Sequence, residues 1–475
     1  SMSARIKVLS VDQTARDTLC AALGLPHFIV DVLVSRGIVT PEEAERFLHP
    51  DLERDWRNPY DIDHMGELID SLVSAIKQNK TILVFGDFDL DGISATALLT
   101  RALRTLEASV IPFIPLRFEE GYGLSSAAID RLLTYKPDIV ITVDNGIAAR
   151  DEVKRLQNHG IDVLITDHHE PSELVPQGVP VVDPKCQDIP SDILSGAGVA
   201  LKVVQALGAR FGKPYLWLDL VDLATLGTVA DLMPMVDENR ALVARGIEMI
   251  NTEPRVCIAA LIAQAGIADQ PVTSTNLSFT LVPRLNAAGR MGNAQLALDL
   301  LLCNEYGQAC LLAKELETTN TERRAIESEL AQVAFEQAEQ TYQGRRALVV
   351  SGKDWHEGVK GIVASRLCNR YGVPSILFTI DGDEARGSGR SVGEVNLFKA
   401  IESCKDLLTR FGGHEAAVGV TLPAALLPQF YERLCAYMDT LDIESFTPRI
   451  TVDACVDFSE LTLDNVRKLE MLAPY

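Results

Sequence analysis

The stretch TILVFGDFDLDG, residues 81–92, decides the fold. Its first five residues form a nearly continuous apolar run, which is typical of a strand buried on both faces of a parallel sheet. The run ends in Gly-Asp, and the next segment, GISATALLTRAL (92–103), has the periodicity of a helix. The order of strand, acidic turn and helix predicts the first unit of an α/β sheet.

Three further short apolar runs follow along the chain. DIVITVD ends at residue 144, IDVLITD ends at residue 167, and VPVVDP covers 179–184. Amphipathic segments such as IAARDEVKRLQNHG (147–160) alternate with these runs. The alternation predicts a parallel sheet that is covered by helices on both faces.

A second α/β lobe is predicted towards the C-terminus. There ALVVSG (347–352), SILFTI (375–380) and AAVGVTL (416–422) are strand-like, and a long, mostly polar helical pattern over 305–341 precedes them. That pattern fits a connector between lobes better than a core helix. After Pro448 one strand-like and one helical run remain, too little to bury a core. The expected division is 1–78 (mainly helical), 79–303 (first α/β domain), 304–342 (connecting helix), 343–447 (second α/β domain) and 448–475 (incomplete start of a further domain).

Composition limits the classes of function. The chain of 475 residues carries 66 acidic and 44 basic residues, a formal charge of −22. A protein that binds nucleic acid over its whole surface is expected to be basic, so any anionic substrate must be bound locally. The hydrophobic content of 47% excludes disorder as the main state. Nine cysteines without a CxxC pair, and apolar runs too short for a membrane span, are typical of a soluble, cytoplasmic protein.

Acidic residues follow three of the predicted strands. They are Asp87, Asp89 and Asp91 after the first strand, Asp144 after the second, and Asp167 with His168 and His169 after the third. Because the carboxyl ends of parallel strands meet at one edge, we expect these groups to converge there, with Asp231 joining them from a helix end. Convergent carboxylates repel one another unless cations neutralise them, and this oxygen-rich set favours Mn²⁺ or Mg²⁺ over zinc. Taken alone, a single Asp after a strand is usually a turn or helix-cap residue, so the prediction rests on several such residues meeting at one edge of the sheet.

The motifs GDFDLDG, VDNG, TDHHE and VADLMP occur in this order, and together they resemble the four motifs of the DHH phosphoesterase superfamily. Five further stretches resemble the RecJ family of bacterial single-strand-specific 5′→3′ DNA exonucleases: LRFEEGYGLS (116–125), PRLNAAGR (283–290), WHEGVKGIVASRL (355–367), GSGRS (387–391) and FGGHEAAVG (411–419). The resemblance implies an α/β fold with a parallel-sheet DHH catalytic domain and a second α/β DHH-associated domain. A long helix joins the two domains, and a groove lies between them. A C-terminal OB-like domain is expected to be absent or truncated in this chain.

The resemblance also implies a phosphodiesterase site that holds two Mn²⁺ or Mg²⁺ ions. The implied metal ligands are Asp87, Asp89, Asp91, Asp144, His168 and Asp231. Asp144 is expected to bridge the ions, His169 to contact the scissile phosphate, and Asp167 to orient the histidines, so all eight side chains count as catalytic. Many relatives carry His where this chain has Phe85, so one ion is expected to bind more weakly or to rely on Asp87.

Substrate contacts are implied for a second set of residues: Arg117, Tyr122, Arg284, Arg290, His356, Ser388, Arg390, Gly412, Gly413 and His414. Ser388 and Arg390, in a GSGRS turn, offer a hydroxyl and a planar guanidinium suited to the terminal 5′-phosphate. Arg117 and Tyr122 resemble a groove entrance that tracks one strand and excludes duplex. The alternatives are arginines paired with surface carboxylates, a core aromatic at Tyr122, and a plain turn at Gly412.

The sequence therefore predicts a metal-dependent 5′→3′ exonuclease that hydrolyses single-stranded DNA to 5′-mononucleotides in DNA repair and recombination. Two alternatives stay open. A DHH phosphodiesterase of short oligonucleotides or cyclic dinucleotides would keep the chemistry, whereas a DNA-binding scaffold would have lost it. The implied partners are single-stranded DNA with a 5′ end, single-strand DNA binding protein and a helicase. A monomer without membrane contact is expected.

Overall fold

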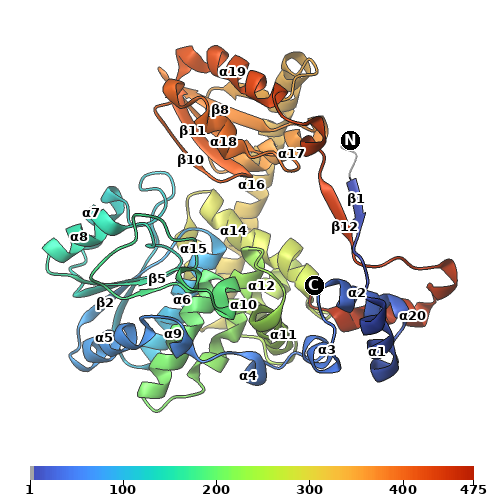
Figure 1. The fold of residues 1–475 in the computed structure, drawn as a ribbon. Helices are drawn as coiled ribbons and strands as arrows, with labels where there is room; N and C mark the ends of the chain where they lie inside the picture. The colour runs from blue at the N-terminus through green and yellow to red at the C-terminus, as the bar shows by residue number, and fades with distance from the viewer. Residues whose placement is uncertain (1–4) are drawn as a thin grey trace. The chain divides into compact units, whose positions relative to one another are not determined.

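The computed structural model describes residues 5–475, which form two compact units (Figure 1). The larger unit comprises Pro41–Asn320 and Leu463–Tyr475. The smaller unit comprises residues 5–40 and Thr321–Thr462. The predicted N-terminal segment 1–78 is divided between the two units, and its first four residues lie outside the described part of the chain.

The larger unit is built on a five-stranded parallel sheet. In spatial order its strands are β3 (Ser109–Phe113), β2 (Thr81–Phe85), β4 (Ile139–Thr142), β5 (Asp162–Thr166) and β6 (Val181–Val182). Strand β2 pairs with β3 and β4, and Phe85 lies opposite Phe113 and Thr142. The predicted parallel sheet is confirmed, and the carboxyl ends of β2, β4 and β5 are adjacent.

Helices cover both faces of this sheet. They are α5 (Met65–Lys77), α6 (Leu90–Thr105), α7 (Ser126–Leu133), α8 (Arg150–Asn158), α9 (Gly196–Arg210) and α10 (Val221–Ala230). Ile82 and Val84 of β2 pack in one core with α5, α6, α9 and α10, whereas Leu83 and Phe85 pack in another core with α7 and α8. The two apolar faces of β2 explain why both sides of the sheet are covered. The remaining helices of the unit are α3 (Pro41–Leu48), α4 (Leu52–Asp55), α11 (Asp237–Thr252), α12 (Val256–Ala265), α13 (Ser274–Asn276), α14 (Val282–Arg290), α15 (Ala294–Leu301) and α20 (Leu463–Lys468).

The smaller unit contains a mixed five-stranded sheet. In spatial order its strands are β10 (Arg410–Gly413), β11 (Ala417–Pro423), β9 (Glu384–Arg390), β8 (Ser375–Asp381) and β7 (Leu348–Gly352). Strands β7 and β8 are parallel, and the other neighbours pair antiparallel. Its helices are α16 (Tyr306–Thr341, shared with the larger unit), α17 (Lys360–Tyr371), α18 (Leu397–Glu402) and α19 (Leu427–Asp439). Helices α16 and α17 pack on one face of the sheet, and α18 and α19 pack on the other.

The segment GSGRS, predicted as a turn, lies in strand β9 up to Arg390. Gly387 is opposite Phe378 of β8, and a Cβ atom at Gly387 would lie 2.6 Å from the Phe378 ring. Gly389 is opposite Ile376, and its Cβ atom would lie 2.9 Å from the Ile376 side chain. The glycines therefore leave room for large core side chains without ending the strand, and the turn prediction is wrong.

The predicted long helix is α16, a single helix of 36 residues. Its first part contributes Ala309, Ala313 and Leu316 to the core of the larger unit, and its last part contributes Leu330 and Ala334 to the core of the smaller unit. Within each part these residues recur at intervals of three or four, so each part of the helix buries one face in its own unit. Among residues 5–475, α16 included, no helix combines the length and apolar character that a membrane span needs.

The two ends of the chain complete the fold. Strand β1 (Arg5–Val8) pairs in parallel with β12 (Arg449–Val452) in the smaller unit, which also holds α1 (Gln13–Leu23) and α2 (His27–Ser35). Helix α20 belongs to the larger unit. The predicted incomplete domain, 448–475, is therefore divided between the two units.

A buried arginine holds the last residues on the larger unit. Arg240 of α11 is 2% exposed, and its guanidinium donates hydrogen bonds to the carbonyl oxygens of Leu472 (2.8 Å), Ala473 (2.9 Å) and Pro474 (2.7 Å). It also donates to the carbonyl oxygen of Phe47 (2.7 Å) and lies 3.9 Å from the centre of the Phe47 ring. One side chain thus fixes the terminal segment to α11.

Arg240→Met is expected to lower the free energy of unfolding of the larger unit by about 3 kcal/mol, because buried carbonyl groups lose a charged donor. We also expect faster proteolysis near residues 469–475. Urea denaturation and limited proteolysis measure the two effects. Arg245→Met, on the same helix but half-buried, is the matched control. A variant with the stability and cleavage pattern of the parent protein would contradict the assigned role of Arg240.

Candidate metal centre

The acidic and histidine side chains predicted from the sequence come together in the larger unit. Asp87, Asp89 and Asp91 follow β2, Asp144 follows β4, and Asp167, His168 and His169 follow β5. Asp231 directly follows the last residue of α10. The arrangement agrees with the rule that ligands of an open parallel sheet bind beyond the carboxyl ends of its strands.

His168 lies at the middle of this cluster. Its Nε2 atom is 3.0 Å from Asp144 Oδ1, 3.4 Å from Asp91 Oδ2 and 3.3 Å from Asp231 Oδ2. Three groups of side chains can each hold a metal ion, because their ligand atoms lie within 4.8 Å of one another. The groups are Asp87, Asp89 and Asp144; Asp91, His168 and Asp231; and Asp144, His168 and His169. Asp144 and His168 each belong to two groups.

Burial makes the carboxylates costly to ionise. Burial and the neighbouring carboxylates raise the pKa values of Asp87, Asp91 and Asp144 well above the ordinary range. Burial and Asp89 raise the pKa of Asp231 to about 6. These groups favour either a proton or a cation, and a divalent ion satisfies several of them at once.

The donor atoms fit a hard divalent ion. Burial and the charge of His169 lower the pKa of His168 to about 4, so its imidazole is neutral at pH 7. Asp144 Oδ1 and His168 Nε2 are both buried, and neither has a hydrogen-bond partner among the described residues. Two unsatisfied atoms facing each other across 3.0 Å are well placed to share a cation. Oxygen ligands with one or two imidazoles suit Mn²⁺ or Mg²⁺.

Without divalent ions, the melting temperature is expected to fall as the pH rises from 5 to 8. The buried carboxyl groups have raised pKa values when folded and values near 4 when unfolded, so the folded state binds more protons. The stability that those protons provide is present at low pH and is lost as the pH rises through the raised pKa values, about 6 for Asp231. Mn²⁺ replaces the protons and should raise the melting temperature by about 5 °C at pH 8, and by less at pH 5. Thermal scans with Mn²⁺ or EDTA test this, and an equal effect at both pH values would contradict it.

Asp167 accepts hydrogen bonds from both histidines, from the backbone of His168 and the ring of His169. Its carboxylate accepts hydrogen bonds from the Ile147 amide (3.1 Å), the His168 amide (2.8 Å) and His169 Nδ1 (2.6 Å). Burial opposes a charge on His169, but the bond to Asp167 outweighs burial and raises the pKa of His169 to about 9. Without a metal ion, His169 is therefore a cation at neutral pH, which suits a contact with phosphate. It has to lose its proton to join Asp144 and His168 as a metal ligand.

Backbone amides of α9 hold Asp91, and sequence reasoning missed them. The amides of Gly196 and Ala197 donate to the two carboxylate oxygens of Asp91, each over 2.9 Å. Ser195 caps the same helix by accepting a hydrogen bond from the Gly198 amide. The start of a helix carries free amides and a partial positive charge, so it stabilises an anion. The sequence signal was the run Ser-Gly-Ala-Gly at 195–198, which opens a helix.

Asn145 ties the ends of β2 and β4 together. Its side-chain amide donates to the carbonyl oxygens of Phe85 (3.2 Å), Gly86 (3.0 Å) and Val143 (3.0 Å). The ring of Phe85 stacks on Phe113 with centroids 5.2 Å apart, inside the apolar core shared with α7 and α8. Position 85 therefore faces this core, so its ring does not occupy a ligand position beside the carboxylates.

Two of the predicted substrate residues lie beside the centre. The hydroxyl of Tyr122 donates to the carbonyl oxygen of Asp144 (3.0 Å), and its ring meets His169 edge-on, with centroids 6.2 Å apart. Tyr122 is 53% exposed, so it is not a core aromatic. The guanidinium of Arg117 lies 5.2 Å from the ring of Phe88, which sits between two of the acidic residues.

The arginines of α14 have different surroundings. Arg284 forms an ion pair with Glu317 (2.6 Å) and donates to the carbonyl oxygen of Thr280 (2.7 Å), which matches the alternative of a paired arginine. Arg290 is the last residue of α14 and is half-buried. Substrate contact stays a prediction for both residues.

Three of the predicted residues of the smaller unit, Ser388, Arg390 and Gly412, lie on one face of its sheet. Ser388, Gly419 and Gly412 face one another across β9, β11 and β10. A Cβ atom added at Gly412 or Gly419 would meet no described atom within 4 Å, so the backbone is open there. Arg390 follows Ser388 at the spacing that keeps both side chains on the same face.

The two predicted histidines of the smaller unit lie in loops, and the predicted Gly413 lies at the end of a strand. His356 precedes α17 and accepts a hydrogen bond from the Gly358 amide (2.9 Å). His414 is exposed, follows β10, and accepts one from the Ala416 amide (3.2 Å). Gly413 ends β10 with a φ of 126°. A role in substrate binding stays a prediction for these positions.

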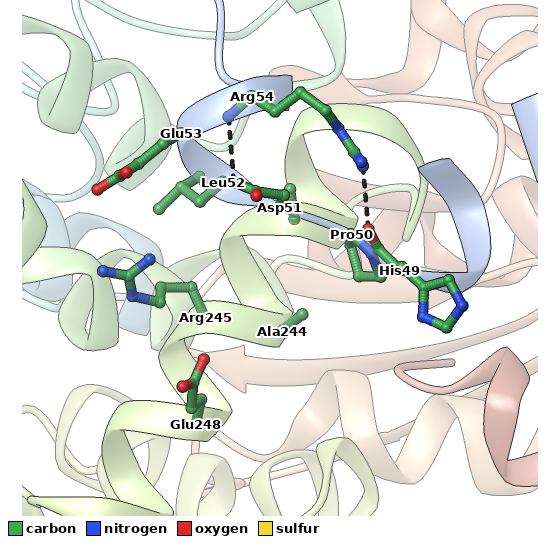
Figure 2. Close-up of a pocket in the computed structure, with 10 residues that line it drawn as sticks. His49, Pro50, Asp51, Leu52, Glu53, Arg54, Ala244, Arg245 and Glu248 are labelled. Carbon is green, nitrogen blue, oxygen red and sulfur yellow. Dashed lines mark hydrogen bonds between the residues drawn. The ribbon is translucent and has the colours of Figure 1, made fainter. Parts of the chain in front are cut away.

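Figure 2 shows a separate pocket of about 460 Å³ in the larger unit. It lies between α11 and residues 49–54, where Arg54 donates to the carbonyl oxygen of His49 (3.0 Å). Arg245 and Glu248 of α11 line its other side. It contains none of the clustered carboxylates, so it is distinct from the candidate metal centre.

Comparisons with protein-family models define the class of protein to which the chain belongs. The model of the DHH family, N-terminal domain, matches residues 81–228, and the DHHA1 domain model matches residues 344–440. A parallel sheet with this acidic edge, followed along the chain by a DHHA1 domain, is thus a DHH-type protein.

Individual relatives show which family of DHH-type proteins the chain resembles. Single-stranded-DNA-specific exonuclease RecJ of Bacillus subtilis is 36% identical over 99% of this chain, which spans 60% of that relative. RecJ of Dickeya dadantii is 34% identical over 95% of this chain and 82% of the relative. The crystal structure of Thermus thermophilus RecJ in complex with Mn²⁺ has a TM-score of 0.85 and 32% identity, covering 99% of this chain and 68% of that one. The chain belongs to the RecJ family of single-stranded-DNA-specific exonucleases.

Proposed function

We propose that this chain is a metal-dependent exonuclease that hydrolyses single-stranded DNA from the 5′ end to 5′-mononucleotides. The observation that carries the proposal is the largely buried cluster in which Asp144 and His168, both buried, each belong to two groups able to hold a divalent ion. The names of the curated relatives support single-stranded DNA as the substrate. The Mn²⁺ complex of the Thermus relative supports the choice of ion.

The residues of the larger unit would hold two ions and the scissile phosphate. Bound Mn²⁺ or Mg²⁺ would supply charge neutralisation at the phosphate and a water of lowered pKa. The proposed ligands are Asp87, Asp89, Asp91, Asp144, His168 and Asp231. His169 is charged at neutral pH and can donate a hydrogen bond to a phosphate oxygen. Tyr122 is exposed beside His169 and can stack on a base without reading its sequence.

The smaller unit would recognise the terminal 5′-phosphate. Arg390 and Ser388 lie on one face of β9, and Gly419 on the neighbouring β11 and Gly412 on β10 leave the backbone open beside them. A guanidinium and a hydroxyl beside a surface without side chains together suit a phosphate dianion. Recognition of this end would set the 5′→3′ direction.

End-specific digestion tests the proposed function. The substrates are a long 5′-phosphorylated single strand labelled at either end, the matching duplex and a dinucleotide, each with Mn²⁺, Mg²⁺ or EDTA. We expect the 5′ label to be released first as mononucleotide, little cleavage of duplex, and no cleavage in EDTA. Release from the 3′ end first, or cleavage of the dinucleotide alone, would refute the proposal.

The cellular role, location, oligomeric state and protein partners are proposed from the family resemblance. We propose a role in DNA repair and recombination in the cytoplasm, as a monomer, with contacts to single-strand DNA binding protein and a helicase. We also propose that residues 79–303 form the catalytic domain and 343–447 the DHH-associated domain, with 304–342 as the connecting helix. The matches of the two domain models to residues 81–228 and 344–440 support this division.

A further inference from the structure

A fully buried ion pair joins two helices of the larger unit. Lys202 of α9 and Glu238 of α11 are both 0% exposed, and Lys202 Nζ lies 2.6 Å from Glu238 Oε2. Lys202 also donates to the carbonyl oxygen of Arg57 (2.6 Å) and lies 3.8 Å from the centre of the Trp56 ring. The ammonium group is therefore satisfied on several sides.

The carboxylate of the pair is equally well satisfied. Glu238 accepts hydrogen bonds from the Ser191 hydroxyl (2.5 Å) and the Arg57 amide (2.9 Å). Burial lowers the pKa of Lys202 to about 8. Burial opposes ionisation of Glu238, but Lys202 outweighs it and keeps the pKa of Glu238 below its ordinary value. Both side chains are therefore charged at neutral pH.

Such a pair is a poor source of stability. Removing two charges from water costs several kcal/mol, and well-packed apolar side chains at the same positions are often as stable or more stable. An ion pair with this many hydrogen-bond partners instead holds the surrounding segments in one defined geometry. The pair therefore fixes α9 and α11 relative to each other.

On one side the pair is anchored on α9, the helix whose amides bind Asp91. Lys202 lies less than two turns after Gly196, whose amide, with that of Ala197, binds the Asp91 carboxylate over 2.9 Å. A shift of α9 along its axis would move these two amides. Asp91 would then move with them or lose its hydrogen bonds.

On the other side the pair is anchored at the start of α11, the helix that follows the loop carrying Asp231. This loop runs from Asp231 at the end of α10 to Asp237 at the start of α11, and Glu238 lies in the first turn of α11. Next to Glu238, Asn239 donates to the carbonyl oxygens of Pro234 in the loop (3.0 Å) and Ile193 before α9 (2.8 Å). The start of α11 therefore fixes the loop against the segment that leads into α9.

We propose that the Lys202–Glu238 pair positions Asp91 relative to Asp231, and so shapes the metal-binding group that these two form with His168. The two residues are positioning residues, because neither belongs to the metal-binding groups. The proposal rests on the metal centre of the proposed function. It assigns the buried pair a role in metal affinity.

The test compares Mn²⁺ binding of the wild-type protein with that of the double variant Lys202→Met and Glu238→Gln. The glutamine keeps an acceptor for Ser191 and Arg57 while both charges are removed. Calorimetric titration should show one Mn²⁺ site weakened about 10-fold, the range expected for loss of a group that supports a ligand. The Mn²⁺ concentration for half-maximal nuclease activity should shift by the same factor, and saturating Mn²⁺ should restore kcat.

A second ion pair of the same unit provides the control. Arg255 and Asp222 are 3.0 Å apart, and Asp222 lies at the start of α10, away from the end that carries Asp231. The variant Arg255→Met with Asp222→Leu should keep the wild-type Mn²⁺ affinity. A folded Lys202→Met and Glu238→Gln variant with unchanged affinity at every site would overturn the proposal.

Two further outcomes are decisive. If the wild-type protein binds no Mn²⁺, the metal centre itself is refuted, and the positioning role falls with it. If the double variant fails to fold, Ser191→Ala gives the answer, because it removes one hydrogen bond to Glu238 and leaves the charges in place. About 3-fold weaker binding to one site would then support the proposal, and unchanged binding would overturn it.

Discussion

Asp144→Asn is expected to lower single-strand nuclease activity at least ~1,000-fold, which corresponds to about 4 kcal/mol of transition-state stabilisation. Asp144 belongs to two of the three metal-binding groups, so its loss weakens more than one of them. Asn is the better replacement because Asp144 has a φ of 62°, a left-handed conformation that Asn tolerates and Ala disfavours. The effect is measured as kcat/KM on a 5′-phosphorylated single strand with saturating Mn²⁺.

The same variant should be at least as stable as the wild-type protein when divalent ions are removed. Burial and the carboxylates of Asp91, Asp89 and Asp87 raise the pKa of Asp144, so a neutral side chain relieves repulsion there. A melting temperature that is kept or raised, together with lost activity, would separate a functional role from a folding role. Asp188→Asn, an exposed carboxylate outside the cluster, is the control. Wild-type activity in Asp144→Asn would show that the assigned centre is wrong.

Arg390→Ala is expected to lower kcat/KM on 5′-phosphorylated single strands about 100-fold, the loss of a charge-assisted contact of nearly 3 kcal/mol. The guanidinium of Arg390 donates to the carbonyl oxygen of Gly389 (2.8 Å), and it has no carboxylate partner in the part of the chain that the structure describes. Burial lowers its pKa, which is the sign of a cation without enough neighbouring negative charge. A phosphate would supply that charge.

The comparison of phosphorylated and hydroxyl 5′ ends makes this prediction specific. Arg390→Ala should remove most of the preference for the phosphate. Gly361→Ala should remove part of it, because a Cβ atom there would lie 2.2 Å from Arg390 Nη2 and displace the guanidinium. Arg386→Ala is the matched control, since Arg386 lies on the same strand but pairs with Glu357 and Asp381. An undiminished preference in Arg390→Ala would exclude it as the end anchor.

The centre was predictable because its parts are local. Each acidic motif directly follows a strand that the apolar pattern reveals, and parallel strands bring their carboxyl ends together. Asp231 was harder to place from pattern alone because it follows a helix. Its place beside His168, at 3.3 Å, depends on how α10 packs against the sheet.

The parts that could not be predicted depend on contacts between distant residues. The amides of α9 that hold Asp91 come 105 residues later in the sequence. Lys202 and Glu238 are separated by 36 residues, and each alone is typical of an exposed helix position. The turn prediction for the GSGRS segment was wrong because glycines usually mark a turn, whereas here they make room for the side chains of Phe378 and Ile376 within a strand.

The orientation of Phe85 limits how this centre could be redesigned. Successive side chains of a strand point to opposite faces, so the last residue of β2 is committed to the core with Phe113. An imidazole introduced there would enter an apolar core and would not reach the carboxylates. A histidine-rich, zinc-selective version of the site would have to replace one of the clustered carboxylates, such as Asp87 or Asp89, beyond the end of the strand. Because position 85 points into the core, a substitution there cannot add an imidazole ligand, and the metal centre keeps its preference for ions that bind oxygen.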